Sequence, residues 1–529
     1  MGCSSSIPKV RPDPIVPAEA PKEAGGATAS RETARATASA PPGDAPQLDP
    51  TTDSSHSAAS RVQVHASTEC LASMGPVLLV SDLGVGSVVA TNAGPAGTST
   101  PTYLAMNPFG CLPALRDLEN GVVLGQGSAI LRYLAMRFAP ELYPPKDPKR
   151  RAFIDWAMDV VDCDLAPDAL VTVLPLIDFR DGPDDQALAG REASAHLEQF
   201  ASQFLRERFI GGKRPSAADY KVAPYFFCFA HPAVKVQSEV SCPDRIRQWI
   251  SDFMAHCPSC ELLHTARGHA LKQLLDKTEW GSPAAMMLTD PTAAPPEAED
   301  LLSQLAVGRG SVKLYGSSAS LDCLGPFMLG LDNKCAELMD KMSGQVVDPE
   351  GLLEAEPLRL APTMKDGDYA LAGSAVILRY LAQKFAPRFY LPDPAIRARI
   401  DWACDCFAFN GLYEAAVATI HPCLGFGELR EDIGALGSAL KGRLQQFADV
   451  FLRDRFVGGD SPCIADYRVA PFFFAWGHPT LRARCSIIVP ERITKFNADF
   501  AAASPHGRML SDASGWALKE ALDRNRGQP

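Results

Sequence analysis

Hydrophobic and polar residues follow the same pattern twice along the chain. Residues 107–140, NPFGCLPALRDLENGVVLGQGSAILRYLAMRFAP, hold a Pro-containing segment, a short apolar strand, a polar turn, a second short strand and a run of apolar residues at helical spacing. Residues 356–387, EPLRLAPTMKDGDYALAGSAVILRYLAQKFAP, repeat this order. The pattern predicts a β-hairpin followed by a helix that ends before Pro140 or Pro387. The same module therefore occurs twice.

The repeat extends in both directions from the hairpin. Residues 61–82 align without gaps on residues 311–332, and each stretch predicts a strand, a polar loop and a helix, with a second strand near residues 86–92 or 336–342. Downstream stretches with helical spacing also recur, residues 147–159 as 393–405 and residues 204–232 as 451–479. The fold class predicted for each repeat is α/β plus all-α, a β-α-β-β-α domain followed by an all-helical domain.

These patterns predict six segments along the chain. They are a disordered tail at 1–60, the β-α-β-β-α domain of the first repeat at 61–142, its helical domain at 143–280, a linker rich in Ala, Pro and Asp at 281–310, the β-α-β-β-α domain of the second repeat at 311–388, and its helical domain at 389–525.

Composition narrows the classes of function. The chain has 529 residues, 46% of them hydrophobic, and a formal net charge of −11, which argues against a nucleic-acid surface. No apolar run approaches the ~20 residues that a membrane-spanning helix needs. The 15 cysteines are scattered and odd in number, which favours a reducing compartment over a disulfide scaffold.

The N-terminal tail carries a second kind of signal. It is rich in Ala, Pro, Ser and Thr, and it cannot bury enough surface to offset the entropy of ordering. It begins Met1-Gly2-Cys3-Ser4-Ser5-Ser6, which matches N-myristoylation of Gly2 and leaves Cys3 for a second, reversible acyl chain. Because one myristoyl chain binds a bilayer only marginally and the tail has few basic residues, Cys3 would supply the second signal. A chance match in a Ser-rich terminus is the alternative.

Several motifs together resemble cytosolic glutathione transferases, in two tandem copies. Leu112-Pro113 and Ala361-Pro362 stand where the family has its cis-proline, whose strand binds the peptide part of glutathione. The Ser216 to Asp219 segment resembles the family's buried helix N-cap, and Cys463 to Asp466 is its second copy, with a thiol as the poorer cap. The His-Pro steps at 231–232 and 478–479 are most similar to the theta class. The resemblance implies thioredoxin-like domains followed by helical domains, and glutathione as co-substrate.

The resemblance also implies a catalytic residue in each copy. Residues 314–320, LYGSSAS, resemble the theta-class segment in which a serine hydroxyl stabilises the glutathione thiolate, and this serine is Ser320. The aligned residue in the first copy is Cys70, which resembles the cysteine classes that transfer thiols through a mixed disulfide. A small residue that fills a tight turn is the alternative for both. Either role needs the helix to begin at the residue, whereas Pro76 or Pro326 could shift the helix start to itself.

The glutathione cradle is incomplete in both copies. The family places an acidic residue or Gln, followed by Ser, at the start of the helix after the hairpin, where they hold the γ-glutamyl carboxylate. The first copy has Gln126-Gly127 and lacks the hydroxyl, whereas the second has Gly373-Ser374 and lacks the side-chain partner. One lost hydrogen bond to a charged group is worth about 1.5 to 3 kcal/mol, so glutathione binding would be weakened without being abolished.

A further cluster, Cys257 and Cys260 with His256 and His264, has C-x-x-C spacing. It lies in the predicted helical domain and is absent from the second repeat, so we expect ordinary helix-end residues and no metal. Trp156 and Trp402, at matching positions of the two repeats, are expected in the core or at an interface.

Two functions from different classes remain open. The first is an acylated tandem enzyme that transfers glutathione to hydrophobic electrophiles, mainly through Ser320, with Cys70 degenerate or thiol-transferring. The second is a non-catalytic scaffold or binding protein that keeps the fold at a membrane. Both predict a cytoplasmic protein attached to the cytoplasmic face of a membrane by its acyl chains. Both also predict that the repeats pack as an internal pseudo-dimer, or that the chain forms a homo-oligomer, with no nucleic-acid partner.

Overall fold

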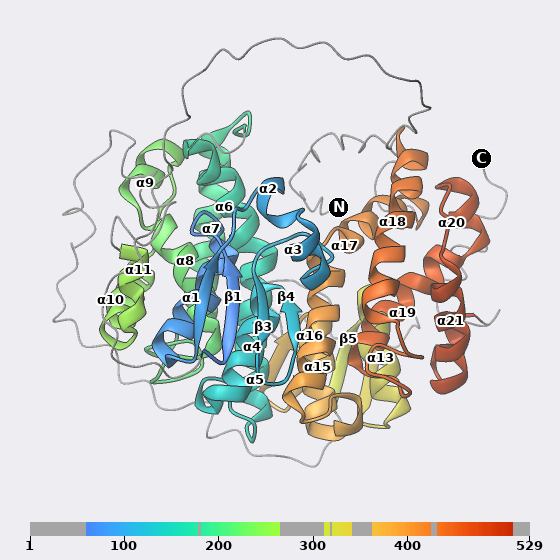
Figure 1. Ribbon diagram of the computed structural model, residues 1–529. Coiled ribbons are helices and arrows are strands. Elements are labelled where there is room, and N and C mark those ends of the chain that lie inside the picture. Colours follow the sequence, from blue (N-terminus) through green and yellow to red (C-terminus); the bar gives the residue numbers. More distant parts are fainter. Residues whose placement is uncertain are drawn as a thin grey trace, which may run out of the picture. The chain divides into compact units, whose positions relative to one another are not determined.

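The computed structural model describes residues 60–177, 181–264, 312–317, 320–340, 362–424 and 431–511. Figure 1 labels its helices and strands. The predicted linker and nearly all of the predicted tail, including Gly2 and Cys3, lie outside these residues. We call residues 60–264 the first half and residues 312–511 the second half.

The first half contains a mixed four-stranded sheet of order β2-β1-β3-β4. β1 pairs with β2 in parallel and with β3 in antiparallel orientation, and β3 and β4 form the predicted hairpin. Alternate residues of β1 are buried, because one face of the sheet packs on the core. The strands are β1 (Val62–Ala66), β2 (Gly86–Ala90), β3 (Ala114–Asp117) and β4 (Val123–Gly125).

The second half contains a sheet of the corresponding order, β6-β5-β7-β8. β5 and β6 are parallel, whereas β5, β7 and β8 pair in antiparallel orientation. The two sheets therefore have the same strand order and the same pairing, as the repeated pattern predicted. The strands are β5 (Val312–Gly316), β6 (Ala336–Asp340), β7 (Thr363–Asp366) and β8 (Tyr369–Ala372).

Helices surround and follow each sheet. In the first half they are α1 (Leu71–Leu83), α2 (Pro95–Thr98), α3 (Pro101–Met106), α4 (Gly127–Phe138), α5 (Pro148–Val160), α6 (Ala166–Thr172), α7 (Gln186–Phe204), α8 (Ala217–Phe229), α9 (Pro232–Ser238), α10 (Asp244–His256) and α11 (Glu261–His264). In the second half they are α13 (Leu321–Asp332), α15 (Ser374–Phe385), α16 (Pro394–Phe409), α17 (Leu412–Thr419), α18 (Ile433–Phe451), α19 (Ile464–Gly477), α20 (Pro479–Arg484) and α21 (Glu491–Ala503). The short helices α2 and α3 were not predicted, although each begins with a proline, which is typical of a first helical position.

The first helix of each half begins before its proline. α1 begins at Leu71 and α13 at Leu321, so the possible shift of the helix start to Pro76 or Pro326 does not occur. The glycine before each proline is needed for close packing against a second helix. A Cβ on Gly75 would lie 2.7 Å from the backbone oxygen of Tyr220 in α8, and one on Gly325 would lie 2.6 Å from that of Tyr467 in α19. Glycine thus allows two helix backbones to approach closely in each half.

The predicted N-caps are present on the two central helices. In α8, Asp219 accepts from the backbone N–H of Ser216 at 2.7 Å, and in α19 Asp466 accepts from that of Cys463 at 2.7 Å. Both form a capping box, so the thiol of Cys463 keeps the capping geometry. Trp249 donates a further bond to Asp219 at 2.8 Å. Burial raises the pKa of both carboxyl groups to about 6.

Residues of the two halves contact each other at several points. Phe109 of the first half stacks on Phe451 of the second, with ring centroids 5.8 Å apart, and meets Trp402 edge-on at 6.1 Å. The Tyr369 hydroxyl donates to the backbone oxygen of Lys149 at 2.6 Å. Trp402 therefore lies where the halves meet, as one of its two predicted roles required. Among the described helices, none is both long and apolar enough to cross a membrane.

Candidate functional site

Three chain segments converge at one edge of the first sheet. The end of β1 lies opposite the start of β3, which lies opposite the end of β4. Cys70 follows β1, Pro113 precedes β3 and Gln126 follows β4. This strand register therefore brings the predicted residues of the first half into one region, which we call site 1.

Cys70 is the N-cap residue of α1, with extended backbone and a half-exposed side chain that makes no capping hydrogen bond. The thiol therefore lies at the positive end of a 13-residue helix. Tyr103 lies within electrostatic range of Cys70 and of a second thiol, Cys111, and its hydroxyl donates to the Cys111 backbone oxygen at 2.7 Å. Burial raises the pKa of Cys111. Among the thiols of site 1, Cys70 is the one at a helix start.

The predicted cis-proline is confirmed in the first half. The Leu112–Pro113 peptide bond is cis. Asn107 supports the preceding residue, because its amide nitrogen donates to the Cys111 backbone oxygen at 2.8 Å. In the second half, Ala361 lies outside the described residues. Pro362 is buried, and its backbone oxygen accepts from the N–H of Gly373 at 3.0 Å.

Gln126 and Gly373 occupy the same position in the two halves, the N-cap of the helix after the hairpin. Gln126 has φ 67° and Gly373 has φ 92°. A residue other than glycine with positive φ is strained, which is common at binding sites. The Gln126 amide nitrogen donates at 2.6 Å to the side-chain oxygen of Asn410, a residue of the second half. Sequence reasoning missed Asn410, whose only local signal is the Asn410-Gly411 pair.

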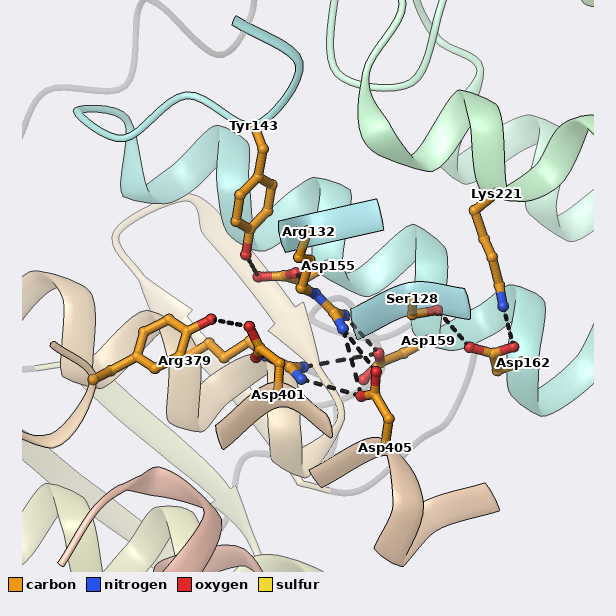
Figure 2. A network of polar contacts seen from close by, with 11 residues as sticks. Ser128, Arg132, Tyr143, Asp155, Asp159, Asp162, Lys221, Arg379, Asp401 and Asp405 are labelled. Atoms are coloured by element: carbon orange, nitrogen blue, oxygen red, sulfur yellow. Dashed lines mark hydrogen bonds and ion pairs between the residues drawn. The ribbon is translucent and has the colours of Figure 1, made fainter. Parts of the chain in front are cut away.

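Site 1 also contains a buried ion pair that the sequence did not predict. Lys221 of α8 contacts Asp162 with its ammonium nitrogen 2.5 Å from the carboxylate, and the other carboxylate oxygen accepts from the Ser128 hydroxyl at 2.8 Å. Figure 2 shows this chain of contacts. Asp162 lies in a π-helical turn between α5 and α6, and such turns are frequent at functional sites. The hydroxyl at the start of α4 therefore already has a partner within the protein.

The corresponding region of the second half, which we call site 2, contains Ser320, Pro362, Gly373 and Ser374. Ser320 is the N-cap residue of α13 and makes no capping hydrogen bond with its side chain. Ser374 is the first residue of α15 and is 7% exposed, and its hydroxyl has no hydrogen-bond partner among the described residues. A buried hydroxyl without a partner is energetically costly. This orphaned hydroxyl at a helix start is the feature of site 2 that most needs a ligand.

A carboxylate lies beside Ser320 and is neutralised in place. Asp322, in the first turn of α13, accepts from Arg468 at 2.6 Å and from the Tyr413 hydroxyl at 2.8 Å. The Arg468 guanidinium also lies 5.3 Å from the centre of the Phe407 ring and 5.4 Å from that of Phe472, within cation–π range. Arg468 and Lys221 occupy matching positions of α19 and α8, but their carboxylate partners come from different elements.

A buried cluster of charged side chains links the two halves (Figure 2). Arg132 of α4 contacts Asp155 at 2.6 Å and Asp405 of the second half at 3.1 Å. Arg379 of α15 contacts Asp405 at 3.2 Å. Two further carboxylates complete the cluster, namely Asp401, 2.7 Å from Arg379, and Asp159, 3.4 Å from Arg132 and 4.0 Å from Arg379.

The cluster has more carboxylates than guanidinium groups. Burial raises the pKa of Asp159 to about 7 and also raises the pKa of Asp405. Burial opposes ionisation of Asp401 too, but Arg379 and Arg132 lower the pKa of that carboxyl below its usual value. Asp159 therefore holds a proton at pH values below about 7, which reduces the excess negative charge of the cluster.

Cys257 and Cys260 are buried at the end of α10 and in the turn that follows it, and burial raises the pKa of both thiols. Among the described residues, no group of three or more His, Cys, Asp and Glu side chains could hold a metal ion.

Comparison with known proteins identifies relatives of the chain. It is 31% identical over 174 residues to maleylacetoacetate isomerase from Pseudomonas aeruginosa, covering 31% of this chain and 76% of that protein. It is 32% identical over 135 residues to human glutathione S-transferase theta-2, covering 24% of this chain and 55% of that protein. Against the Leishmania trimeric glutathione transferase TDR1, the identity is 14% over 88% of this chain and 100% of that one, with a TM-score of 0.33. No protein-family model matches.

The chain belongs to the glutathione S-transferase family. Human glutathione S-transferase theta-2 and glutathione S-transferase GstB from Escherichia coli are two of the similar proteins that carry the family name. The chain spans only 55% and 62% of these two proteins.

Proposed function

We propose that the chain is a glutathione transferase with two tandem copies of the family's unit, in which site 2 conjugates glutathione to hydrophobic electrophiles. The single observation that carries this proposal is Ser374, whose buried hydroxyl has no partner among the described residues. The start of a 12-residue helix is a favourable place for an anion, and the γ-glutamyl carboxylate of glutathione would supply one.

Ser320 would act on the sulfur. A glutathione thiol is mostly protonated at neutral pH, and the reactive species is the thiolate. The Ser320 hydroxyl would donate to the sulfur at the start of α13, where the helix dipole also favours negative charge. Asp322, two residues away, would oppose the thiolate if its charge were free, but Arg468 and Tyr413 offset that charge.

Pro362 would orient the peptide part of glutathione. It directly precedes β7, and its own backbone oxygen is bound to the N–H of Gly373. This bond links the strand that would pair with glutathione to the helix start that would hold the carboxylate. The two contacts would then fix the tripeptide at both ends.

Site 1 differs in chemistry, and we propose thiol transfer through Cys70. The Cys70 thiolate would attack the glutathione sulfur of a mixed disulfide, and the substrate would leave as a thiol. A second glutathione thiolate would then attack the Cys70 adduct, releasing glutathione disulfide and regenerating Cys70. Leu112, Pro113, Gln126 and Gly127 would hold the tripeptide. Because Gly127 has no hydroxyl and Gln126 is bound to Asn410, we expect weaker glutathione binding here than at site 2.

The test uses the full chain and titrates it with glutathione by calorimetry, followed by a conjugation assay with an aryl halide. Loss of one hydrogen bond to the carboxylate should weaken binding at site 2 at least tenfold in Ser374→Ala, since such a bond contributes about 1.5 to 3 kcal/mol. Ser320→Ala should lower kcat and leave KM nearly unchanged. Cys70→Ala should remove thiol transfer and spare conjugation. Ser128→Ala is the control, because it also removes a hydroxyl at the start of a helix, but one that is bound to Asp162, and it should not change glutathione binding at site 2.

A non-catalytic scaffold is the second candidate, and the incomplete cradles favour it. Gly127 lacks the hydroxyl in the first half, and Gly373 lacks the side-chain partner in the second. This candidate predicts no heat of binding at millimolar glutathione and no turnover in either assay. That result would exclude the transferase proposal for both sites.

We further propose that the two halves form an internal pseudo-dimer. The contacts of Arg132 with Asp405 and of Phe109 with Phe451 support this arrangement. Light scattering of the purified chain should then give the mass of a single chain. A multiple of that mass would favour the homo-oligomer instead.

Attachment to a membrane through acyl chains on Gly2 and Cys3 also remains a proposal. It rests on the sequence pattern alone. In cells, Gly2→Ala should move the chain from the membrane fraction to the soluble fraction, and Cys3→Ser should weaken retention. Unchanged fractionation of both variants would contradict it.

A further inference from the structure

Two cysteines of the second half lie against each other in a region outside both sites. The Cys423 and Cys485 sulfur atoms are 3.7 Å apart, and the residues are 62 positions apart in the sequence. Cys423 lies in a short turn after α17, Pro422–Leu424, and Cys485 directly follows α20. Both residues are buried, at 1% and 0% exposed. Two thiols that distant segments bring into contact differ from scattered core cysteines.

The first half supplies a built-in comparison for this pair. At the matching positions it has Leu176 and Ser238. The Ser238 hydroxyl donates to the Thr172 backbone oxygen at 2.6 Å, and the Cys485 thiol donates to the Thr419 backbone oxygen at 3.5 Å. Both halves therefore place a hydrogen-bond donor on this backbone carbonyl, and the serine of the first half shows that the donor need not be a thiol. The second sulfur, at the position of a leucine, is what the second half adds.

The backbone at Cys485 is held firmly by its neighbours. A Cβ on Gly437 of α18 would lie 1.6 Å from the backbone oxygen of Cys485, and one on Gly190 of α7 would lie 1.6 Å from that of Ser238. Both halves therefore pack this segment against a helix with no room for even a methyl group. Since the backbone is fixed, the short distance between the sulfurs follows from the fold.

The electrostatic environment favours reaction at Cys423. Its pKa is lowered to about 7 by the hydrogen bond with Cys485 and by the neighbouring Arg484, whereas the same hydrogen bond raises the pKa of Cys485. A thiolate is the form of cysteine that a peroxide oxidises, and a thiol in contact with it can then attack the oxidised sulfur. The neighbours Ser486 and Ile488 are exposed, so the pair lies just below the surface.

We propose that Cys423 and Cys485 are a redox-modification site that forms a reversible disulfide with a hydroperoxide as oxidant. The Cys423 thiolate attacks the peroxide, the O–O bond breaks, and the released hydroxide takes up a proton, leaving a sulfenic acid on Cys423. The Cys485 sulfur then attacks the Cys423 sulfur, the S–O bond breaks, and the hydroxyl leaves as water with the Cys485 proton. The two thiols are oxidised and one hydrogen peroxide is reduced to two waters.

A small oxidant is required because the pair is buried, and only a short movement is needed. A disulfide has sulfurs about 2.05 Å apart, so the two atoms must approach by roughly 1.7 Å from their present separation. Cys485 would give up its bond to Thr419. The product would tie the turn after α17 to the end of α20 and close a long loop, which constrains the unfolded chain.

The test treats the full-length reduced chain with hydrogen peroxide, blocks the remaining thiols and maps the peptides without reductant. We expect a cross-link between Cys423 and Cys485 that a thiol reductant removes, together with a higher thermal midpoint after oxidation. Cys423→Leu and Cys485→Ser introduce the residues of the first half, and neither should cross-link. Cys485→Ser should stop at the sulfenic acid, which a sulfenic-acid reagent would label on Cys423.

The outcome that overturns the proposal is a wild-type chain in which both cysteines remain alkylatable while other thiols react, or in which Cys423 cross-links elsewhere. The wild-type map decides the question even if a variant fails to fold. A reciprocal variant of the first half, Leu176→Cys with Ser238→Cys, should gain the cross-link if the backbone geometry alone permits it. Failure of that variant with a cross-linked wild type would assign the reactivity to Arg484 and the local charge.

Discussion

The two halves differ most in the segment that follows their matching Asp159 and Asp405. In the first half, the chain passes from α5 through a π-helical turn, Val161–Leu165, directly into α6. In the second half, α16 ends at Phe409 with Asn410 as its C-cap residue, and α17 begins after Gly411, which has φ 81°. The π-helical turn directs Asp162 toward Ser128 and Lys221 of its own half, whereas the break releases Asn410 to contact Gln126 of the other half.

This difference shows how a repeated sequence can give two unlike sites. The buried cation is kept in both halves as Lys221 or Arg468, and each has a carboxylate partner, Asp162 or Asp322. A buried charge must be paired, and the two halves meet this requirement with carboxylates from different elements. The hydroxyl of Ser128 in site 1 is bound to Asp162, whereas the hydroxyl of Ser374 in site 2, at the position of Gly127, has no partner among the described residues.

The largest effect is expected at the cluster that the halves share. Arg132→Met and Arg379→Met each leave buried carboxylates unpaired, which typically costs about 3 to 5 kcal/mol. Arg132→Met should lower the free energy of unfolding more than Arg379→Met. Arg132 lies within 3.4 Å of three carboxylates, whereas one Arg379 nitrogen has no hydrogen-bond partner among the described residues. Denaturant unfolding of both variants would measure the difference. Equal effects would mean that the halves contribute symmetrically.

The second prediction concerns pH and isolates Asp159. Its pKa of about 7, against an ordinary 3.8, means that the folded chain holds a proton that the unfolded chain has lost. The free energy of unfolding should therefore fall as pH rises from about 4 to 7, and Asp159→Asn should remove about 3 kcal/mol of this decline.

The control for Asp159→Asn is the part of the pH dependence that the variant and the wild-type chain share. Asp219 and Asp466, whose pKa values are also raised but which lie outside the cluster, are present in both chains and cancel in the difference. A difference in unfolding free energy that stays constant between pH 4 and 7 would show that Asp159 ionises normally.

The third prediction tests the helix break itself. Gly411→Ala places a side chain at φ 81°, which costs about 1 kcal/mol, and its Cβ would lie 1.7 Å from an Arg443 nitrogen, so the Arg443 side chain must also move. It should also disturb Asn410 and thereby weaken glutathione binding at site 1 more than at site 2. Gly121→Ala is a suitable control, since that glycine also has positive φ but its Cβ would meet no atom within 4 Å and it lies in a hairpin turn. Equal changes in glutathione binding from the two variants would show that Asn410 does not contribute to binding at site 1.

The smallest effect is expected at the N-caps. Cys463→Ser gives α19 the cap residue that α8 has as Ser216, and it should stabilise the chain by about 0.5 kcal/mol. The gain is limited because Asp219 also accepts from Trp249, and the matching position in the second half is Phe496. Thermal unfolding measures it. A loss of stability would show that the N-cap position of α19 packs better around a sulfur atom than around a hydroxyl.

Much of the fold could be predicted because its signals are local. The hairpins, the helices that follow them and the N-caps of α8 and α19 rest on alternation, helical spacing and short capping motifs, which nearby residues determine. The start of the first helix could not be settled locally. Pro76 and Pro326 favoured a later helix start. The structure shows instead that the glycine before each proline allows the backbone of α8 or α19 to approach closely.

The candidate sites divide in the same way. Cys70, Ser320, Gln126 and Ser374 could be named from the sequence because the stretches around them resemble the motifs of glutathione transferases. The residues that were missed, Asn410, Asp162 and Asp322, carry no motif. Their positions depend on which distant side chain each one reaches, and the break at Gly411 or the π-helical turn decides this.

By itself, the sequence determined the repeated order of strands and helices and the residue types at the helix starts, because periodicity and capping act over a few neighbouring residues. Only the tertiary structure decided which charges meet. It brought Arg132 to Asp405, Gln126 to Asn410 and Cys423 to Cys485. The physical reason is that pairing a buried charge, amide or thiol depends on distance in space, and sequence separation does not limit it.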